Sequence, residues 1–186
     1  TVGLSASAVE RLQQVAGAIR DGAIDAARTA LDAVLAEARD HPEALRLLAV
    51  VQLRQQRPTD AIASLRRALA AWPDDGLLRS DLGNAQAAAG DIDAAIASWR
   101  RATELAPDQA MPWFNLGRQL QLRGDSMAAA KALERAVDIA PDLLPARILH
   151  GDALVHLGRF DDAIAHYRAA LALHPACGDA WRGLGQ

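Results

Sequence analysis

Residues 110–143 read AMPWFNLGRQLQLRGDSMAAAKALERAVDIAPDL, and this stretch holds the pattern that decides the fold. In its first half, Trp113, Leu116 and Leu120 recur three and four residues apart, which is the spacing of one face of a helix. Gly124 interrupts this pattern, and a second helical pattern then runs to Pro141, because proline cannot continue a helix. The stretch therefore predicts a helix, a turn and a second helix.

The same pattern recurs along the chain with a period of 34 residues. Five columns of proline, glycine or alanine keep this register: Pro73, Pro107, Pro141 and Pro175; Gly83, Gly117, Gly151 and Gly185; Gly22, Gly90, Gly124 and Gly158, with Gln56 as the exception; Ala27, Ala61, Ala95, Ala129 and Ala163; and Ala68, Ala102, Ala136 and Ala170. A small residue at a helix crossing lets two backbones approach closely. The register predicts five repeats, at 8–41, 42–75, 76–109, 110–143 and 144–177, and a partial repeat at 178–186. Just after the turns, Asp91, Asp125 and Asp161 are predicted to cap the second helices.

Composition agrees with an all-α fold and limits the function. The 186 residues include 43 alanines and only seven aromatics, which favours helices over sheets. A net charge of -3 provides no field for a polyanion, so we expect no nucleic-acid partner. No apolar run is long enough for a membrane span and no leader is present, so we expect a cytoplasmic protein. The single cysteine, Cys177, excludes an internal disulfide and is interpreted as incidental.

The columns resemble those of the tetratricopeptide repeat (TPR) family, whose 34-residue unit carries Trp-x-x-Leu-Gly, then Gly, Ala, a large apolar residue, Ala and Pro. Residues 110–143 match this motif throughout, whereas Leu45, Arg79 and Arg147 stand where the family has tryptophan, and there we expect looser packing. The resemblance implies one right-handed α-solenoid of stacked antiparallel helix pairs over 1–186. Because the sixth repeat stops within its first helix and the chain lacks an initial methionine, we expect a fragment of a longer protein. The alanine-rich composition is a hint of a bacterial source.

In the family, the first helices of the repeats line a concave face that commonly holds a peptide. The register places the following residues on that face: Arg46, Leu47, Val50 and Arg54; Leu77, Ser80, Asp81 and Asn84; Met111, Phe114, Asn115, Arg118 and Gln121; and Ile148, Leu149, Asp152, Val155 and His156. Phe114 is either an anchor for a partner side chain or a core residue against the next repeat. The arginines either bind a carboxylate or pair with Asp81 and Asp152, and the asparagines can hold a peptide backbone.

The leading hypothesis is therefore a protein-interaction module that binds a peptide or protein segment. The carboxylate clamp of chaperone-binding members is incomplete, because Ser80, Pro145 and Leu149 occupy the positions of its basic residues. A first alternative is the substrate-recognition region of a larger bacterial transferase or hydroxylase. A second is a scaffold that self-associates through apolar residues such as Val9 and Leu12. No His-Glu-x-x-His motif, Gly-x-Ser-x-Gly motif or phosphate loop occurs, so we expect no catalytic residue, cofactor or metal in this chain.

Overall fold

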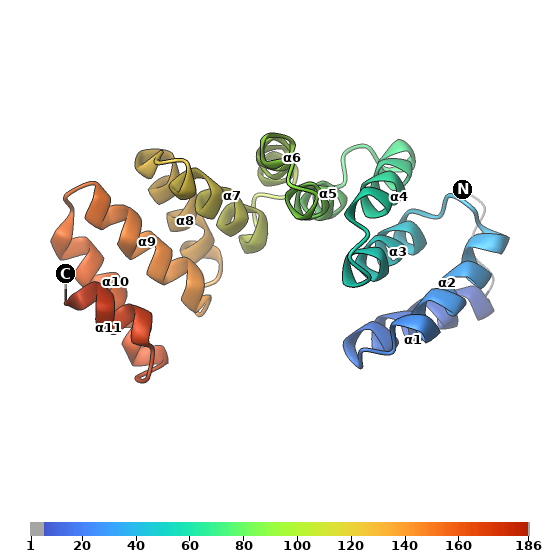
Figure 1. The fold of residues 1–186 in the computed structure, drawn as a ribbon, viewed down its shortest axis with the longest axis horizontal. Coiled ribbons are helices and arrows are strands. Elements are labelled where there is room, and N and C mark those ends of the chain that lie inside the picture. The colour runs from blue at the N-terminus through green and yellow to red at the C-terminus, as the bar shows by residue number, and fades with distance from the viewer. Residues whose placement is uncertain (1–5, 186) are drawn as a thin grey trace. The chain divides into compact units, whose positions relative to one another are not determined.

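The computed structural model describes residues 6–185, and over these residues the chain is built from helices joined by short turns (Figure 1). Each full repeat contributes two helices of 13 to 15 residues, and the partial repeat contributes one short helix. The helices are α1 (Ala6–Arg20), α2 (Ile24–Glu37), α3 (Pro42–Arg54), α4 (Pro58–Ala71), α5 (Gly76–Ala88), α6 (Ile92–Leu105), α7 (Ala110–Leu122), α8 (Ser126–Ile139), α9 (Leu144–His156), α10 (Phe160–Leu173) and α11 (Gly178–Leu184). The predicted all-α fold is confirmed. No helix within 6–185 is long and apolar enough to cross a membrane.

The helices form two compact units that divide after Leu105. In unit 1, α1–α2, α3–α4 and α5–α6 pack as pairs, and the first helices of successive repeats also touch. In unit 2, α7–α8 and α9–α10 form the pairs, and α11 packs on α9 and α10. Each unit is therefore a stack in which odd-numbered helices line one side and even-numbered helices the other. The expectation that 1–186 is one continuous array stays a prediction.

The glycine column marks the point where the two helices of a pair are closest. A Cβ atom added at Gly83 would lie 2.6 Å from Nε1 of Trp99, and one at Gly117 would lie 2.6 Å from Cγ of Leu133. Trp99 and Leu133 are fully buried or nearly so, so neither has room to retreat. At these two crossings the large residue on the second helix therefore leaves no room for a side chain on the first.

The turns between paired helices explain a second column. Gly90 and Gly124 have φ of +85° and +80°, a left-handed conformation that glycine adopts without strain, and Gln56 takes φ of +59° in the same place. The capping prediction is confirmed for Asp91 and Asp125, whose Oδ1 atoms accept from backbone N–H groups at 3.1 Å. It is wrong for Asp161, because α10 begins at Phe160 and its N-cap is Arg159. Asp161 lies two positions past the cap column, in the first turn.

The tryptophan column contains a substitution that preserves a hydrogen bond. Nε1 of Trp113 donates to the carbonyl oxygen of Pro107 at 3.1 Å, six residues upstream. In the neighbouring repeats, Nη2 of Arg79 donates to the carbonyl oxygen of Pro73 at 3.3 Å, and Nη2 of Arg147 to that of Pro141 at 2.6 Å. Arginine thus replaces the indole as the donor that ties each first helix to the preceding turn.

Candidate functional site

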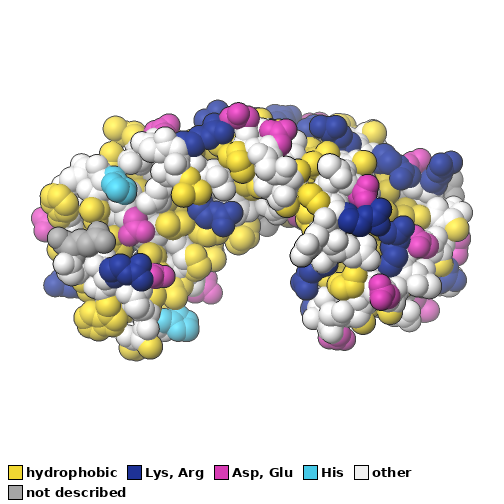
Figure 2. Space-filling model, viewed as in Figure 1, with side chains coloured by type: hydrophobic (Ala, Val, Ile, Leu, Met, Phe, Trp, Pro, Cys, Tyr) yellow, Lys and Arg dark blue, Asp and Glu magenta, His cyan; other side chains and the backbone are white. Residues whose placement is uncertain are grey.

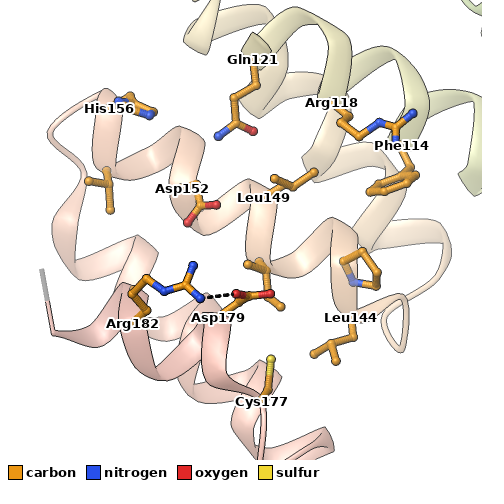
Figure 3. A pocket seen from close by; sticks show the side chains of 14 residues that line it. Phe114, Arg118, Gln121, Leu144, Leu149, Asp152, His156, Cys177, Asp179 and Arg182 are labelled. Atoms are coloured by element: carbon orange, nitrogen blue, oxygen red, sulfur yellow. Dashed lines mark ion pairs between the residues drawn. The ribbon is translucent and has the colours of Figure 1, made fainter. Parts of the chain in front are cut away.

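Unit 2 carries a groove of about 750 Å³ on its first-helix side (Figure 3). The helices α7, α9 and α11, which open three successive repeats, supply most of its lining. The lining residues of this α7–α11 groove are Phe114, Arg118, Gln121, Leu144, Pro145, Ile148, Leu149, Asp152, Val155, His156, Cys177, Asp179, Arg182 and Gly183.

Apolar side chains make up the middle of the α7–α11 groove. Leu144, Ile148 and Val155 are half-buried, and they pack on the core cluster that contains Tyr167. Phe114 is also half-buried and packs on a second cluster around Val137. Phe114 thus packs on the core and also lines the groove, and its role as an anchor for a partner side chain stays a prediction.

Charged and polar groups surround this apolar surface. The guanidinium carbon of Arg118 lies 5.8 Å from the centre of the Phe114 ring, within the range of a cation–π contact. Arg182 forms an exposed ion pair with Asp179 at 2.9 Å. Figure 3 shows Arg118 on α7 and the Arg182–Asp179 pair on α11, with Leu149 between them. The groove therefore offers an apolar surface with a guanidinium group on either side.

Asp152 has a structural bond in addition to its place in the groove. The hydroxyl of Tyr167 donates to its Oδ1 at 2.6 Å. Burial and the bond to Asp152 raise the pKa of Tyr167 well above its ordinary value of 10. Gln121 differs, because its Oε1 is buried and has no hydrogen-bond partner within the described part of the chain. This carbonyl oxygen is therefore an unsatisfied acceptor that solvent does not reach in this conformation.

Eight of the predicted residues come together in the α7–α11 groove: Phe114, Arg118, Gln121, Ile148, Leu149, Asp152, Val155 and His156. Two predicted residues on α7 do not line it. Asn115 is buried inside the helix stack, and Met111 is half exposed outside the groove. Their assignment to a binding site stays a prediction.

In unit 1 the predicted residues mostly serve internal contacts. Arg46 forms ion pairs with Glu43 at 2.8 Å and with Asp81 at 3.4 Å, so the alternative in which this arginine pairs with Asp81 is the one observed. The hydrogen bond to Glu43 raises the pKa of Arg46, and burial raises the pKa of Asp81. Asn84 accepts a hydrogen bond from Trp99 at 3.1 Å. The other members of this predicted set are Leu47 and Ser80, which are buried, Val50, which packs on the core, and Arg54 and Leu77, which are exposed.

Sequence reasoning missed the contribution of α11 to the groove. Asp179 and Arg182 stand four periods after Glu43 and Arg46, in the same columns and with the same ion pair. The recurrence of this acid–arginine pair in the 34-residue register was visible in the sequence, even though the last repeat is only partial. Cys177, interpreted as incidental, lines the edge of the groove, where its thiol is half-buried. Within 6–185, no group of three or more histidine, cysteine or acidic residues is placed to hold a metal ion.

A family profile for the tetratricopeptide repeat matches residues 12–76 and 148–186, and a second one matches residues 52–116. These matches cover more than half of the chain, and it belongs to the tetratricopeptide repeat family. Such a chain is a repeat module of the protein-interaction type. No curated protein matches it.

Solved structures show the same fold. A MamA protein is 24% identical over 90% of this chain and 92% of its own, with a TM-score of 0.73. A thermophilic TPR protein from Thermus thermophilus is 24% identical over 96% and 97%, with a TM-score of 0.72. YrrB, described as a TPR protein with an unusual peptide-binding site, is 17% identical over 96% and 92%, with a TM-score of 0.73. At such identities the likeness concerns the fold alone, and self-association, a cytoplasmic location and a catalytic domain in a longer protein stay predictions.

Proposed function

We propose that the α7–α11 groove binds an extended or helical segment of a partner protein. The observation that carries the proposal is the convergence of three successive first helices on one groove with an apolar middle and arginines on either side. The description of YrrB as a peptide-binding TPR protein lends support by analogy.

The chemistry of the groove suggests how the segment would be held. An apolar side chain of the partner would cover Ile148 and Leu149, which removes apolar surface from water on both molecules. The side-chain amide of Gln121, which lines the groove, would bond to a backbone group of the segment, which holds the segment without reading its sequence. Arg118, which lies over the Phe114 ring, would pair with a carboxylate. Capture of a substrate protein for a catalytic domain elsewhere in a longer protein would use the same contacts.

The test starts from peptides selected on the purified chain from a phage-displayed random library. Binding of the synthetic peptides is measured by fluorescence polarisation for wild type, Arg118→Glu and Leu149→Asn. Asparagine is the residue of the preceding repeat at the position of Leu149, so this change respects the fold. Arg168→Glu is the matched control, since Arg168 is exposed on α10 and does not line the groove.

We expect each groove variant to weaken binding at least about tenfold, the size expected when one central contact is lost. The control should bind as wild type does, and circular dichroism should show unchanged helicity. Selected peptides that bind both groove variants with wild-type affinity would refute the assignment.

A further inference from the structure

A second groove lies within unit 1. It has a volume of about 550 Å³, and its walls come from α4, α5 and α6. Its charged lining residues are the arginines Arg66, Arg79 and Arg101, and no carboxylate from residues 6–185 lines it. This α4–α6 groove is therefore basic, although the chain as a whole carries a net charge of -3 and side chains of both signs are interspersed on the face drawn in Figure 2.

The uncharged residues that line the α4–α6 groove are leucines, alanines and one hydrogen-bonded polar pair. Leu69 and Leu82 contribute apolar surface there and are 7% and 5% exposed. Gln86 accepts a hydrogen bond of 2.6 Å from Ser98, so this buried polar pair satisfies itself. The remaining lining residues are Ala70, Ala94 and Ala97, whose short side chains keep the groove open.

The arginines differ in how far their charge is already compensated. Arg101 pairs with Asp74 at 3.1 Å and with Glu104 at 2.9 Å. Arg79 donates to a carbonyl oxygen, and its Nε is buried without a partner among residues 6–185. Arg66 is exposed and makes no ion pair or side-chain hydrogen bond within the same residues. Two guanidinium groups at one groove thus lack a carboxylate partner in the described part of the chain.

The equivalent positions in unit 2 keep only one of these three arginines, because Arg147 stands two periods after Arg79 and makes the same bond to a proline carbonyl oxygen. Two periods after Arg66 stands Glu134, and two periods after Ala94 stands Asp162, both of which line a groove among α8, α9 and α10. Ala169 replaces Arg101. The unit 2 groove is mixed in charge, because Lys131 and Arg159 line it beside Glu134 and Asp162, whereas the charged lining residues of the α4–α6 groove are all arginines.

We propose that the α4–α6 groove is a second docking site, for an acidic segment of a partner protein. A carboxylate of that segment pairs with Arg66 and Arg79, because guanidinium forks match carboxylates in geometry and charge. An apolar side chain next to it packs on the accessible methyl groups of Ala70, Ala94 and Ala97. A nucleic acid fits less well, because the carboxylates of Asp74 and Glu104 beside Arg101 repel a continuous phosphate backbone.

The test uses the whole chain and a fluorescein-labelled peptide of sequence Glu-Glu-Leu-Glu-Glu, with Lys-Lys-Leu-Lys-Lys and a thymidine decanucleotide as comparison probes. Arg66→Glu introduces the residue that unit 2 holds at this position, so the fold is retained. Arg100→Glu is the matched control, because it changes the net charge equally on α6 but does not line the groove. Arg118→Glu separates this site from the α7–α11 groove.

We expect the acidic peptide to bind wild type and to lose at least about tenfold in affinity with Arg66→Glu, since an attraction becomes a repulsion. Arg100→Glu and Arg118→Glu should change the affinity less than about threefold, and added salt should weaken binding. No binding to wild type, an equal loss with Arg100→Glu, or tighter binding of the decanucleotide would each overturn the proposal.

Discussion

The two histidines at the centre of unit 2 predict a dependence of stability on pH. The rings of His150 on α9 and His166 on α10 are in contact, with centroids 4.3 Å apart and planes inclined by 58°, and the Nδ1 atom of each is buried without a partner within the described residues. His150 is only 6% exposed. Burial lowers its pKa from 6.5 to about 4, and His166, Arg159 and Arg147 act in the same direction, while Asp138 opposes them. Burial also lowers the pKa of His166.

The sign follows from comparing the folded and unfolded chains. Between pH 6.5 and pH 4 the unfolded chain binds a proton at His150 that the folded chain excludes. The contribution of the neutral His150 to the free energy of unfolding is therefore fully present above pH 6.5 and decreases as the pH falls toward 4. The lowered pKa of His150 corresponds to a loss of about 2 kcal/mol in the free energy of unfolding between pH 7 and pH 5.

The perturbation that isolates this effect is His150→Leu. The repeats at 42–75, 76–109 and 110–143 have leucine at the equivalent position, as Leu48, Leu82 and Leu116, and all three are buried. Leucine therefore suits the site, and it removes a buried nitrogen that has no partner among residues 6–185. We expect the variant to be as stable as wild type or more stable at pH 7, and to lose about 2 kcal/mol less than wild type on acidification to pH 5.

The assay is urea unfolding followed by circular dichroism at pH 7, 6 and 5, for wild type, His150→Leu and the control His174→Gln. His174 is exposed at the end of α10, so the control removes a histidine without altering the buried pair. Equal losses in wild type and His150→Leu between pH 7 and pH 5 would refute the reasoning. His174→Gln should lose as much stability as wild type over the same pH range, because it leaves the buried pair unchanged.

Three further changes test the packing of the repeats by urea unfolding. Gln56→Gly should stabilise the chain by about 1 kcal/mol, because glycine relieves the positive φ of this turn; a loss of stability would show that the glutamine side chain matters more. Gly83→Ala should destabilise the chain by about 2 kcal/mol, because the added methyl group meets the buried ring of Trp99. An unchanged urea midpoint would show that the two helices are not in close contact at Gly83. Asn84→Ala should lower the free energy of unfolding by about 2 kcal/mol, because the indole N–H of Trp99 loses its acceptor. Arg118→Ala, in the same column, should lower it by less than about 0.5 kcal/mol. Equal losses in the two variants would contradict the different roles assigned to these residues.

The fold was predictable from the sequence because helix-pair packing repeats identically. Gly117 must be small since Leu133 lies against it, and the same steric condition recurs in other repeats, so it leaves a column of glycines. Pro141 ends a helix by its own covalent structure, whatever its neighbours are. Such local and repeated constraints are visible without coordinates. The cap prediction failed at Asp161 because an aspartate caps a helix only from the cap position, which Arg159 occupies here.

The site was only partly predictable, because a side chain on the first helix serves either the fold or the groove according to a residue on another helix. Arg46 stands in the same column as Phe114, but it pairs with Asp81 of the next repeat. The register gives the position of each residue on the helix face. It does not give the pairing, which depends on the length and charge of side chains that differ from repeat to repeat.

One column shows how this division is decided. Asn84, Arg118 and Asp152 stand one period apart, and the residues that face them from the second helices are Trp99, Leu133 and Tyr167. Where the second helix carries a buried N–H or O–H donor, the first helix supplies an acceptor, as in the bonds of Trp99 to Asn84 and of Tyr167 to Asp152. Leu133 has no donor and needs no acceptor, so the same position can hold an arginine that extends over Phe114 into the groove. The leucine at position 133 therefore leaves Arg118 without a structural bond to make across the helix pair, and this freedom is what the recognition role proposed for Arg118 requires.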